Sequence, residues 1–224
     1  MRKLKAWAAR LTASAQGVAR LHLNKRGMRV LGVAESFREG QARSTLAGVV
    51  MRGDLVVDGF ALGSTSVGGS DATRSLAALY RSLKRGDINL LMLSGCIISK
   101  YNIVDVDALA RRLELPVVCL TYNETAGIAE ALAERFPGDQ DRLLAYQRLG
   151  SREALKLPSG HRIFVRASGM ELKDAAAVLG MFTLQGSVPE PVRVARLLAR
   201  AVSRRSSRRD SRATSGRRSA SRAS

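Results

Sequence analysis

The stretch that decides the fold is "INLLMLSGCIISKYNIVDVDALARRLEL", residues 88–115. Its first eight residues form a continuous apolar run, as expected of a central strand covered on both faces. A helix follows, with Asp105 as its expected N-cap. Sites of α/β proteins are often placed at such a junction. The residue at the loop tip, however, is the neutral Ser94, where a metal-dependent enzyme is expected to carry a carboxylate.

Upstream of this unit, the sequence predicts three strands. Residues 28–37 begin as a strongly apolar run, and two more strand-like runs span residues 46–51 and 55–62. The tripeptide Arg52-Gly53-Asp54 separates the last two runs and indicates a tight hairpin. We therefore expect these three strands to be antiparallel neighbours.

The remaining segments alternate between helical and strand patterns. A helix is expected after Ser70 or Asp71, either of which is a good N-cap. The other expected elements are a strand at 115–122, helices at 125–136 and 139–148, a strand near 162–166, and helices at 170–182 and 187–202. Three antiparallel strands followed by βαβ units predict an α/β fold, a ribonuclease H-like mixed sheet with helices on both faces.

The basic charge is concentrated at the two ends of the chain. The net charge is +18, to which residues 1–29 contribute +8 and residues 204–224 contribute +7, so the segment between them carries only +3. Flexible basic segments attract polyanions in a salt-sensitive way. We therefore expect nucleic acid to bind through the termini.

This distribution suggests three parts. Residues 1–27 are expected to form a basic N-terminal helical extension, residues 28–202 the folded domain, and residues 203–224 a disordered Arg/Ser-rich tail. The longest apolar runs are shorter than the ~20 residues needed to cross a bilayer, so no membrane association is expected. Two isolated cysteines without metal-site spacing are typical of a reduced, cytoplasmic protein. The oligomeric state is left open by the sequence.

Six strings, in order, resemble one family: "RVLGVAESF", "VVMRGD", "VDGF", "GGSDAT", "MLSGCIISKYNIVDV" and "VPEPVRVARLLARAV". They are similar to the endonuclease dU family, a mostly archaeal group related to endonuclease V, and the resemblance covers about residues 28–202. It implies a ribonuclease H-like fold and a DNA endonuclease that acts on damaged or deaminated bases. Such chemistry uses Mg²⁺ or Mn²⁺ held by carboxylates. RNA is a possible second ligand class.

Several acidic positions of the family pattern are lost in this chain. Where the family pattern reads "LGIDDG", this chain has Ala34 in place of the first acid. In place of the acid of "LLDG" it has Ser94, and in place of the first acid of "VDGxDAT" it has Gly68. Alanine has no donor atom, and a serine hydroxyl is a poor ligand for a hard cation. A site that lacks these charges is expected to bind metal weakly.

Other positions of the pattern survive, and the resemblance gives them roles. Glu35, Asp71 and Asp105 are the candidate catalytic acids, with Glu35 and Asp71 as metal ligands. The candidate substrate-binding residues are Ser94, Gly95, Asn102 and Arg52.

Each of these has a structural alternative. Glu35 faces away from position 34 in an extended strand and is equally well explained as a surface or salt-bridge residue. Asp71 and Asp105 are both plausible helix caps. Asn102 is suited to shaping a turn, and an arginine at a hairpin, such as Arg52, is usually solvated.

Two functions follow from these observations. The first is a metal-dependent endonuclease, either active or catalytically degenerate. The second is a non-catalytic nucleic-acid-binding relative that uses its basic termini. A third reading, Ser94 as a nucleophile, lacks a positioned base. The nuclease reading requires the ends of the first and fourth strands to converge beside Asp71 in a shared polar hollow.

Overall fold

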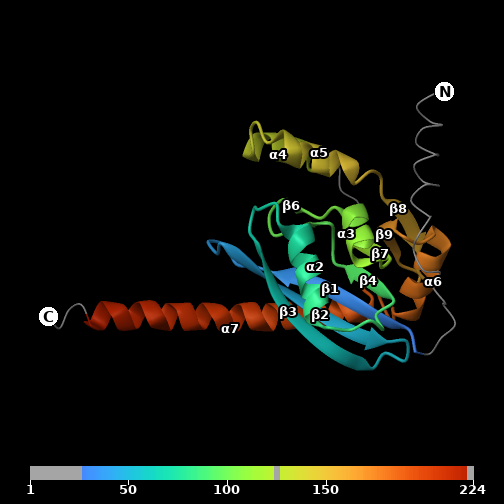
Figure 1. Cartoon of the computed structure of the whole chain (residues 1–224), viewed down its shortest axis with the longest axis horizontal. Coiled ribbons are helices and arrows are strands. Elements are labelled where there is room, and N and C mark those ends of the chain that lie inside the picture. Colours follow the sequence, from blue (N-terminus) through green and yellow to red (C-terminus); the bar gives the residue numbers. More distant parts are fainter. Residues whose placement is uncertain (1–26, 124–126, 221–224) are drawn as a thin grey trace.

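A seven-stranded mixed sheet forms the centre of the computed structural model, which describes residues 27–123 and 127–220, with side chains up to residue 205 (Figure 1). The strand order is β3-β2-β1-β4-β7-β9-β8. Its strands are β1 (Arg29–Ser36), β2 (Arg43–Arg52), β3 (Val57–Ser66), β4 (Leu90–Leu93), β7 (Val117–Thr121), β8 (Glu153–Lys156) and β9 (Arg162–Ser168). The helices are α2 (Ala72–Ser82), α3 (Val106–Leu113), α4 (Ala129–Arg135), α5 (Gln140–Arg148), α6 (Leu172–Met181) and α7 (Glu190–Ala220).

The strand directions confirm the predicted ribonuclease H-like mixed sheet. Strands β1, β2 and β3 pair antiparallel, whereas β1, β4 and β7 run parallel. The connections from β3 to β4 and from β4 to β7 pass through α2 and α3, as expected for crossovers between parallel strands. Strands β9 and β8 add an antiparallel edge.

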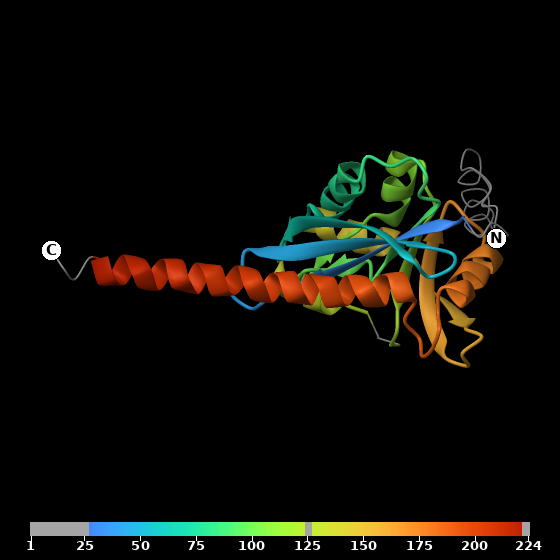
Figure 2. The same cartoon turned by 90° about the horizontal axis from the view of Figure 1, so that it is seen from below.

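Helices cover both faces of the sheet, and alternate residues of each strand point to opposite faces. On one face, Leu31, Val33 and Leu93 pack with α2 and α3; we call this the α2/α3 face. On the other, Val30 and Met92 pack with α6 and the start of α7; this is the α6/α7 face. Figure 2 shows α7 running beneath the sheet, opposite α2 and α3.

Helix α7 lies unusually close to β1 because Gly32 has no side chain. A Cβ atom at Gly32 would lie 2.4 Å from the carbonyl carbon of Pro191. One turn further, Ala34, Val49 and Ala195 form a small buried cluster between the strands and the helix. The helix therefore follows β1 towards the carboxyl end of that strand.

Three features differ from the sequence expectations. A short hairpin, β5 (Ile97–Ile98) and β6 (Asn102–Ile103), lies between β4 and α3, and β8 was not expected. Helix α7 continues to Ala220, where the sequence suggested a disordered tail from residue 203. Arginine and alanine are strong helix formers, so the loss of apolar residues alone does not end a helix.

The helix predicted in the N-terminal extension falls in residues 1–26, outside the described residues. Within the part of the chain that the structure describes, no helix combines the length and apolar character needed to span a bilayer.

Candidate site at the carboxyl edge of the parallel strands

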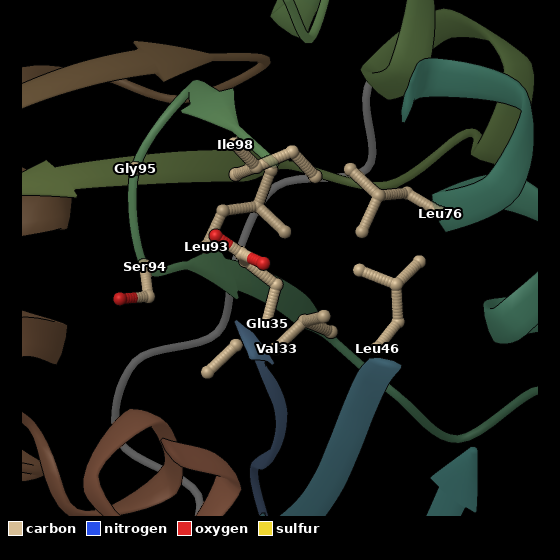
Figure 3. A pocket seen from close by; sticks show the side chains of 9 residues that line it. Val33, Glu35, Leu46, Leu76, Leu93, Ser94, Gly95 and Ile98 are labelled. Atoms are coloured by element: carbon tan, nitrogen blue, oxygen red, sulfur yellow. The ribbon is translucent and has the colours of Figure 1, made fainter. Parts of the chain in front are cut away.

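The carboxyl ends of β1 and β4 meet at a small hollow. Glu35, Ser94 and Gly95 line it together with apolar side chains (Figure 3). Ligands of open α/β sheets commonly bind at this edge. The hollow confirms that the two strand ends converge, but Asp71 is absent from its lining, which is mainly apolar.

Glu35 points to the α2/α3 face and holds the β5–β6 turn. Its carboxylate accepts hydrogen bonds from the Ser44 hydroxyl and from the Ser99 hydroxyl and backbone N–H, the last two at 3.2 Å. Both carboxylate oxygens are therefore engaged by this chain's own donors. Among the described residues Glu35 forms these hydrogen bonds and no salt bridge, and its role as a ligand stays a prediction.

The turn that Glu35 holds is strained. Ser99, Lys100 and Tyr101 have φ values of 46°, 54° and 66°, a left-handed conformation that is unfavourable for residues with a Cβ atom. The backbone N–H of Gly68 donates to the Ser99 carbonyl at 2.7 Å. The Arg142 guanidinium donates to the Tyr101 carbonyl at 2.8 Å. Together with Glu35, these contacts hold the three residues in place.

Asp71 lies outside the hollow, in a hydrogen-bond network of its own. Its carboxylate accepts from the Thr65 hydroxyl and the Asn102 side-chain amide, both at 2.8 Å, and from the Ser66 backbone N–H at 3.0 Å. Burial alone would raise the pKa of Asp71, but these donors outweigh it and hold the pKa well below the ordinary value. The expected N-cap bond is not formed, because this side chain turns back towards β3.

Asn102 connects this network to α2. Its side chain is fully buried, accepts from the Ala72 backbone N–H at 2.9 Å and donates to the Ser66 carbonyl at 2.9 Å. The amide thus takes over the helix-start contact that Asp71 was expected to make. Its contacts link the end of β3 to the start of α2.

Two other candidates lie apart from the hollow. Asp105 caps α3, accepting from the Ala108 backbone N–H at 2.8 Å, as predicted. In the β1–β2 register, Arg52 lies opposite Arg29, at the other end of β1 from Glu35. The two ends are about 20 Å apart along the strand. The Arg52 guanidinium forms an ion pair with Asp54. The structure therefore separates Arg52 from the other candidates.

Two of the positions where the family pattern has an acid, 34 and 94, face α7. Ala34 is 3% exposed and packs against Ala195. The Ser94 hydroxyl points away from the other labelled side chains in Figure 3 and accepts a hydrogen bond of 2.9 Å from Nε of Arg196. The guanidinium of Arg196 also lies over the ring of Tyr122, 4.4 Å from its centroid.

The residues at this edge do not fit a Mg²⁺ or Mn²⁺ site. Such ions need several oxygen ligands with negative charge. On the α6/α7 face the edge offers Ala34, a Ser94 hydroxyl already bonded, and a cation, Arg196. Among residues 27–123 and 127–205, no three His, Cys, Asp or Glu side chains form a group able to hold a metal.

Sequence reasoning missed Arg196 as a site residue. It lies 102 residues after Ser94, and its helical pattern predicts only a solvated position on α7. The available signal was the alternation of side chains along β1 and β4, which places positions 34 and 94 on the same face of the sheet. Recognising that α7 covers this face requires the tertiary structure.

Comparison with known proteins places the chain in a family. The sequence profile described as endonuclease dU matches residues 26–203. A UPF0215 protein of Pyrobaculum calidifontis is 37% identical over 170 residues, covering 75% of this chain and 93% of the relative. A UPF0215 protein of Thermoplasma volcanium is 32% identical over 182 residues, covering 79% and 91%.

Solved structures show the same fold. A protein of unknown function from Archaeoglobus fulgidus superposes with a TM-score of 0.68 at 25% identity, covering 78% of this chain and 98% of that chain. Human ENDOV superposes with a TM-score of 0.60 at 20% identity, covering 91% and 98%. At that identity the likeness to endonuclease V establishes the ribonuclease H-like fold alone. By the match over residues 26–203, the chain belongs to the endonuclease dU family.

Proposed function

We propose that this member of the endonuclease dU family binds DNA without cutting it by metal-dependent chemistry. The observation that carries the proposal is Arg196. Its positive guanidinium is hydrogen-bonded to Ser94, at one of the positions where the family pattern has an acid. A cation there repels a divalent metal and attracts phosphate. At position 34, another position where the family pattern has an acid, the chain has Ala34, which packs beneath the same helix.

The charge of α7 supports nucleic acid as the ligand. The helix contains ten arginines and only two acids, Glu190 and Asp210. It passes the carboxyl edge of the sheet and projects well beyond it (Figure 2). Arginines on an extended basic segment neutralise phosphates and release counterions, which gives binding that weakens as salt increases.

The test separates binding from cleavage in one set of reactions. Full-length protein is incubated with duplex DNA containing uracil or hypoxanthine, with Mg²⁺, Mn²⁺ or EDTA. Binding is followed by fluorescence anisotropy and strand cleavage on denaturing gels. We expect binding in all three conditions, with no requirement for the metal, and no nick. Metal-dependent nicking that disappears in Glu35→Gln would overturn the proposal and support the nuclease alternative.

A restored site makes the same test more informative. Ala34→Asp with Ser94→Asp supplies two carboxylates, but Arg196 would pair with them in place of a metal. We therefore expect no cleavage from this double variant and expect metal binding only when Arg196→Gln is added. Cleavage by the double variant with Arg196 intact would show that the arginine does not block the site.

Deleting residues 204–224 tests the contribution of the basic end. The deletion removes eight arginines and one aspartate. If these side chains contact several phosphates, affinity falls at low salt and the slope of log K against log salt becomes shallower by about 0.9 per lost contact. Unchanged affinity and slope would rule out binding through this segment.

A further inference from the structure

We propose that Arg196, Ser94 and Tyr122 form a binding site for a single phosphate group, in which a guanidinium replaces the metal as the positive centre. We call these three residues the arginine site. The inference rests on the proposed function, because it names the part of the folded domain that would contact a phosphodiester of the bound DNA.

Two parallel strands and helix α7 place the arginine site on one face of the sheet. Ser94 directly follows β4, and Tyr122 directly follows β7. The register pairs Leu93 with Cys119, and side chains alternate along each strand, so both residues point to the α6/α7 face. Arg196 reaches them from α7. The site thus occupies the carboxyl edge where ligands of α/β sheets bind.

The guanidinium is fixed but not fully used. Nε is bonded to Ser94 and the planar group stacks on the Tyr122 ring. In the described part of the chain, neither Nη atom has a hydrogen-bond or ion-pair partner. Two parallel N–H donors of a pre-positioned guanidinium match two oxygens of a phosphate.

Tyr122 also carries an unpartnered hydroxyl. Its hydroxyl is buried and, among the described residues, has no hydrogen-bond partner. Buried polar groups without partners are uncommon and indicate a missing ligand or water. Burial raises the pKa of Tyr122 to about 12, although the nearby Arg196 charge opposes the shift. The hydroxyl therefore stays protonated and able to donate at neutral pH.

Glu35, next to position 34, does not compete with a phosphate for Arg196. Glu35 points to the opposite face of the sheet, where Ser44 and Ser99 satisfy its carboxylate. The Glu190 carboxylate, near the start of α7, pairs with Arg193. Among the described residues, Glu35 and Glu190 are therefore engaged by other groups and do not neutralise Arg196.

The test observes Arg196 directly. In full-length protein labelled with ¹⁵N, the Nε–H correlation of Arg196 is assigned by its absence from Arg196→Lys. Inorganic phosphate is titrated at constant ionic strength against chloride. We expect a saturable shift of this correlation with phosphate and no shift with chloride. An unmoved correlation, or an equal response to both anions, would overturn the proposal.

A second arm identifies the source of the phosphate. A short single-stranded DNA with a 5′-hydroxyl replaces inorganic phosphate, so that only phosphodiesters are present. We expect the same correlation to shift. A response to inorganic phosphate but none to the oligonucleotide would contradict the assignment to nucleic acid and indicate a small phosphorylated ligand.

Matched variants connect the site to DNA affinity. Arg196→Gln and Arg200→Gln remove the same charge from α7, one turn apart, and Arg200 is exposed. We expect Arg196→Gln to lower DNA affinity about tenfold, the loss of one charge-assisted phosphate contact, and Arg200→Gln to have a clearly smaller effect. Equal losses would show only general charge attraction and overturn the site. If the wild type binds no DNA, the proposed function fails, while the inorganic phosphate titration still decides the site.

Discussion

The two faces of the sheet differ at the same edge. On the α2/α3 face the surviving acid, Glu35, is held by Ser44 and Ser99 and stabilises a strained turn. On the α6/α7 face, where the family pattern has acids at positions 34 and 94, the chain has Ala34, Ser94 and the cation Arg196. An acid that survives from a family pattern can therefore be structural, while the altered face carries the candidate ligand site.

The comparison also explains why the surviving acids cannot substitute for the lost ones. Neighbouring strand positions face opposite ways, so Glu35 cannot replace a carboxylate at Ala34. Asp71 is fixed by Thr65, Ser66 and Asn102, outside the hollow. The negative charges that remain are bound to local donors, which leaves the edge without a metal-ligand set.

The largest effect is expected from breaking the packing of the α6/α7 face. Gly32→Val places a side chain against the Pro191 backbone, which already lies 2.4 Å from an ideal Cβ position. Because a backbone cannot yield as a flexible side chain does, we expect a loss of about 3 kcal/mol in the free energy of unfolding. Urea denaturation measures it.

Gly86→Ala is the control for this variant, since a Cβ at Gly86 meets nothing within 4 Å. Its effect should stay within about 0.5 kcal/mol. If Gly32→Val is as stable as the control, α7 does not depend on close contact with β1.

The next effect should come from the Asp71 network on the α2/α3 side. Asn102→Ala removes two donors and the acceptor for the Ala72 N–H from a fully buried position. Leaving such groups unpaired is expected to cost about 2 kcal/mol at pH 7. The exposed Asn123→Ala serves as the control in the same urea experiment, and equal stabilities would contradict the proposed role of the amide.

Asn102→Ala should also change how the free energy of unfolding responds to acid. The folded pKa of Asp71 is lowered, so its contribution to stability is complete above the unfolded carboxyl pKa, about 3.9, and is lost as the pH falls below it. Asn102→Ala removes one of the donors that lower this pKa. We therefore expect the unfolding free energy of the variant to fall less steeply below pH 4 than that of the wild type. Parallel pH profiles would contradict this.

Many of these elements could be predicted from the sequence because their signals are local. The tripeptide Arg52-Gly53-Asp54 indicated the hairpin after β2, and Asp105 caps α3 as its position suggested. The apolar run at 88–95 predicted the central strand that the structure shows as β4. Each of these patterns depends on residues within a few positions of one another.

The contacts that define the site depend on distant residues and could not be predicted in this way. Asp71 looks like a helix cap in sequence, yet Asn102, 31 residues away, holds its carboxylate elsewhere. Ser94 meets Arg196 across 102 residues. The β5–β6 hairpin has only two residues per strand and a left-handed turn without glycine, so it carries almost no sequence signal.

The smallest expected effects on stability come from one substitution on each face of the sheet, and these two variants distinguish the faces most clearly. Ser94→Ala removes the Arg196 hydrogen bond, whereas Glu35→Gln weakens contacts to Ser44 and Ser99. Both should cost about 1 kcal/mol in urea denaturation. Only Ser94→Ala should shift the Arg196 Nε–H correlation and weaken its response to phosphate. A comparable change in Glu35→Gln would show that the two faces are coupled.

Binding of Mn²⁺ to the full-length protein tests the central claim most directly, that this edge carries an arginine in place of a metal site. Electron paramagnetic resonance of free Mn²⁺ during a titration at pH 7 measures the bound fraction. The expected result is no saturable site at micromolar to low millimolar Mn²⁺, with a site emerging only in Ala34→Asp, Ser94→Asp, Arg196→Gln. One tightly bound ion in the wild type, lost in Glu35→Gln, would contradict the account.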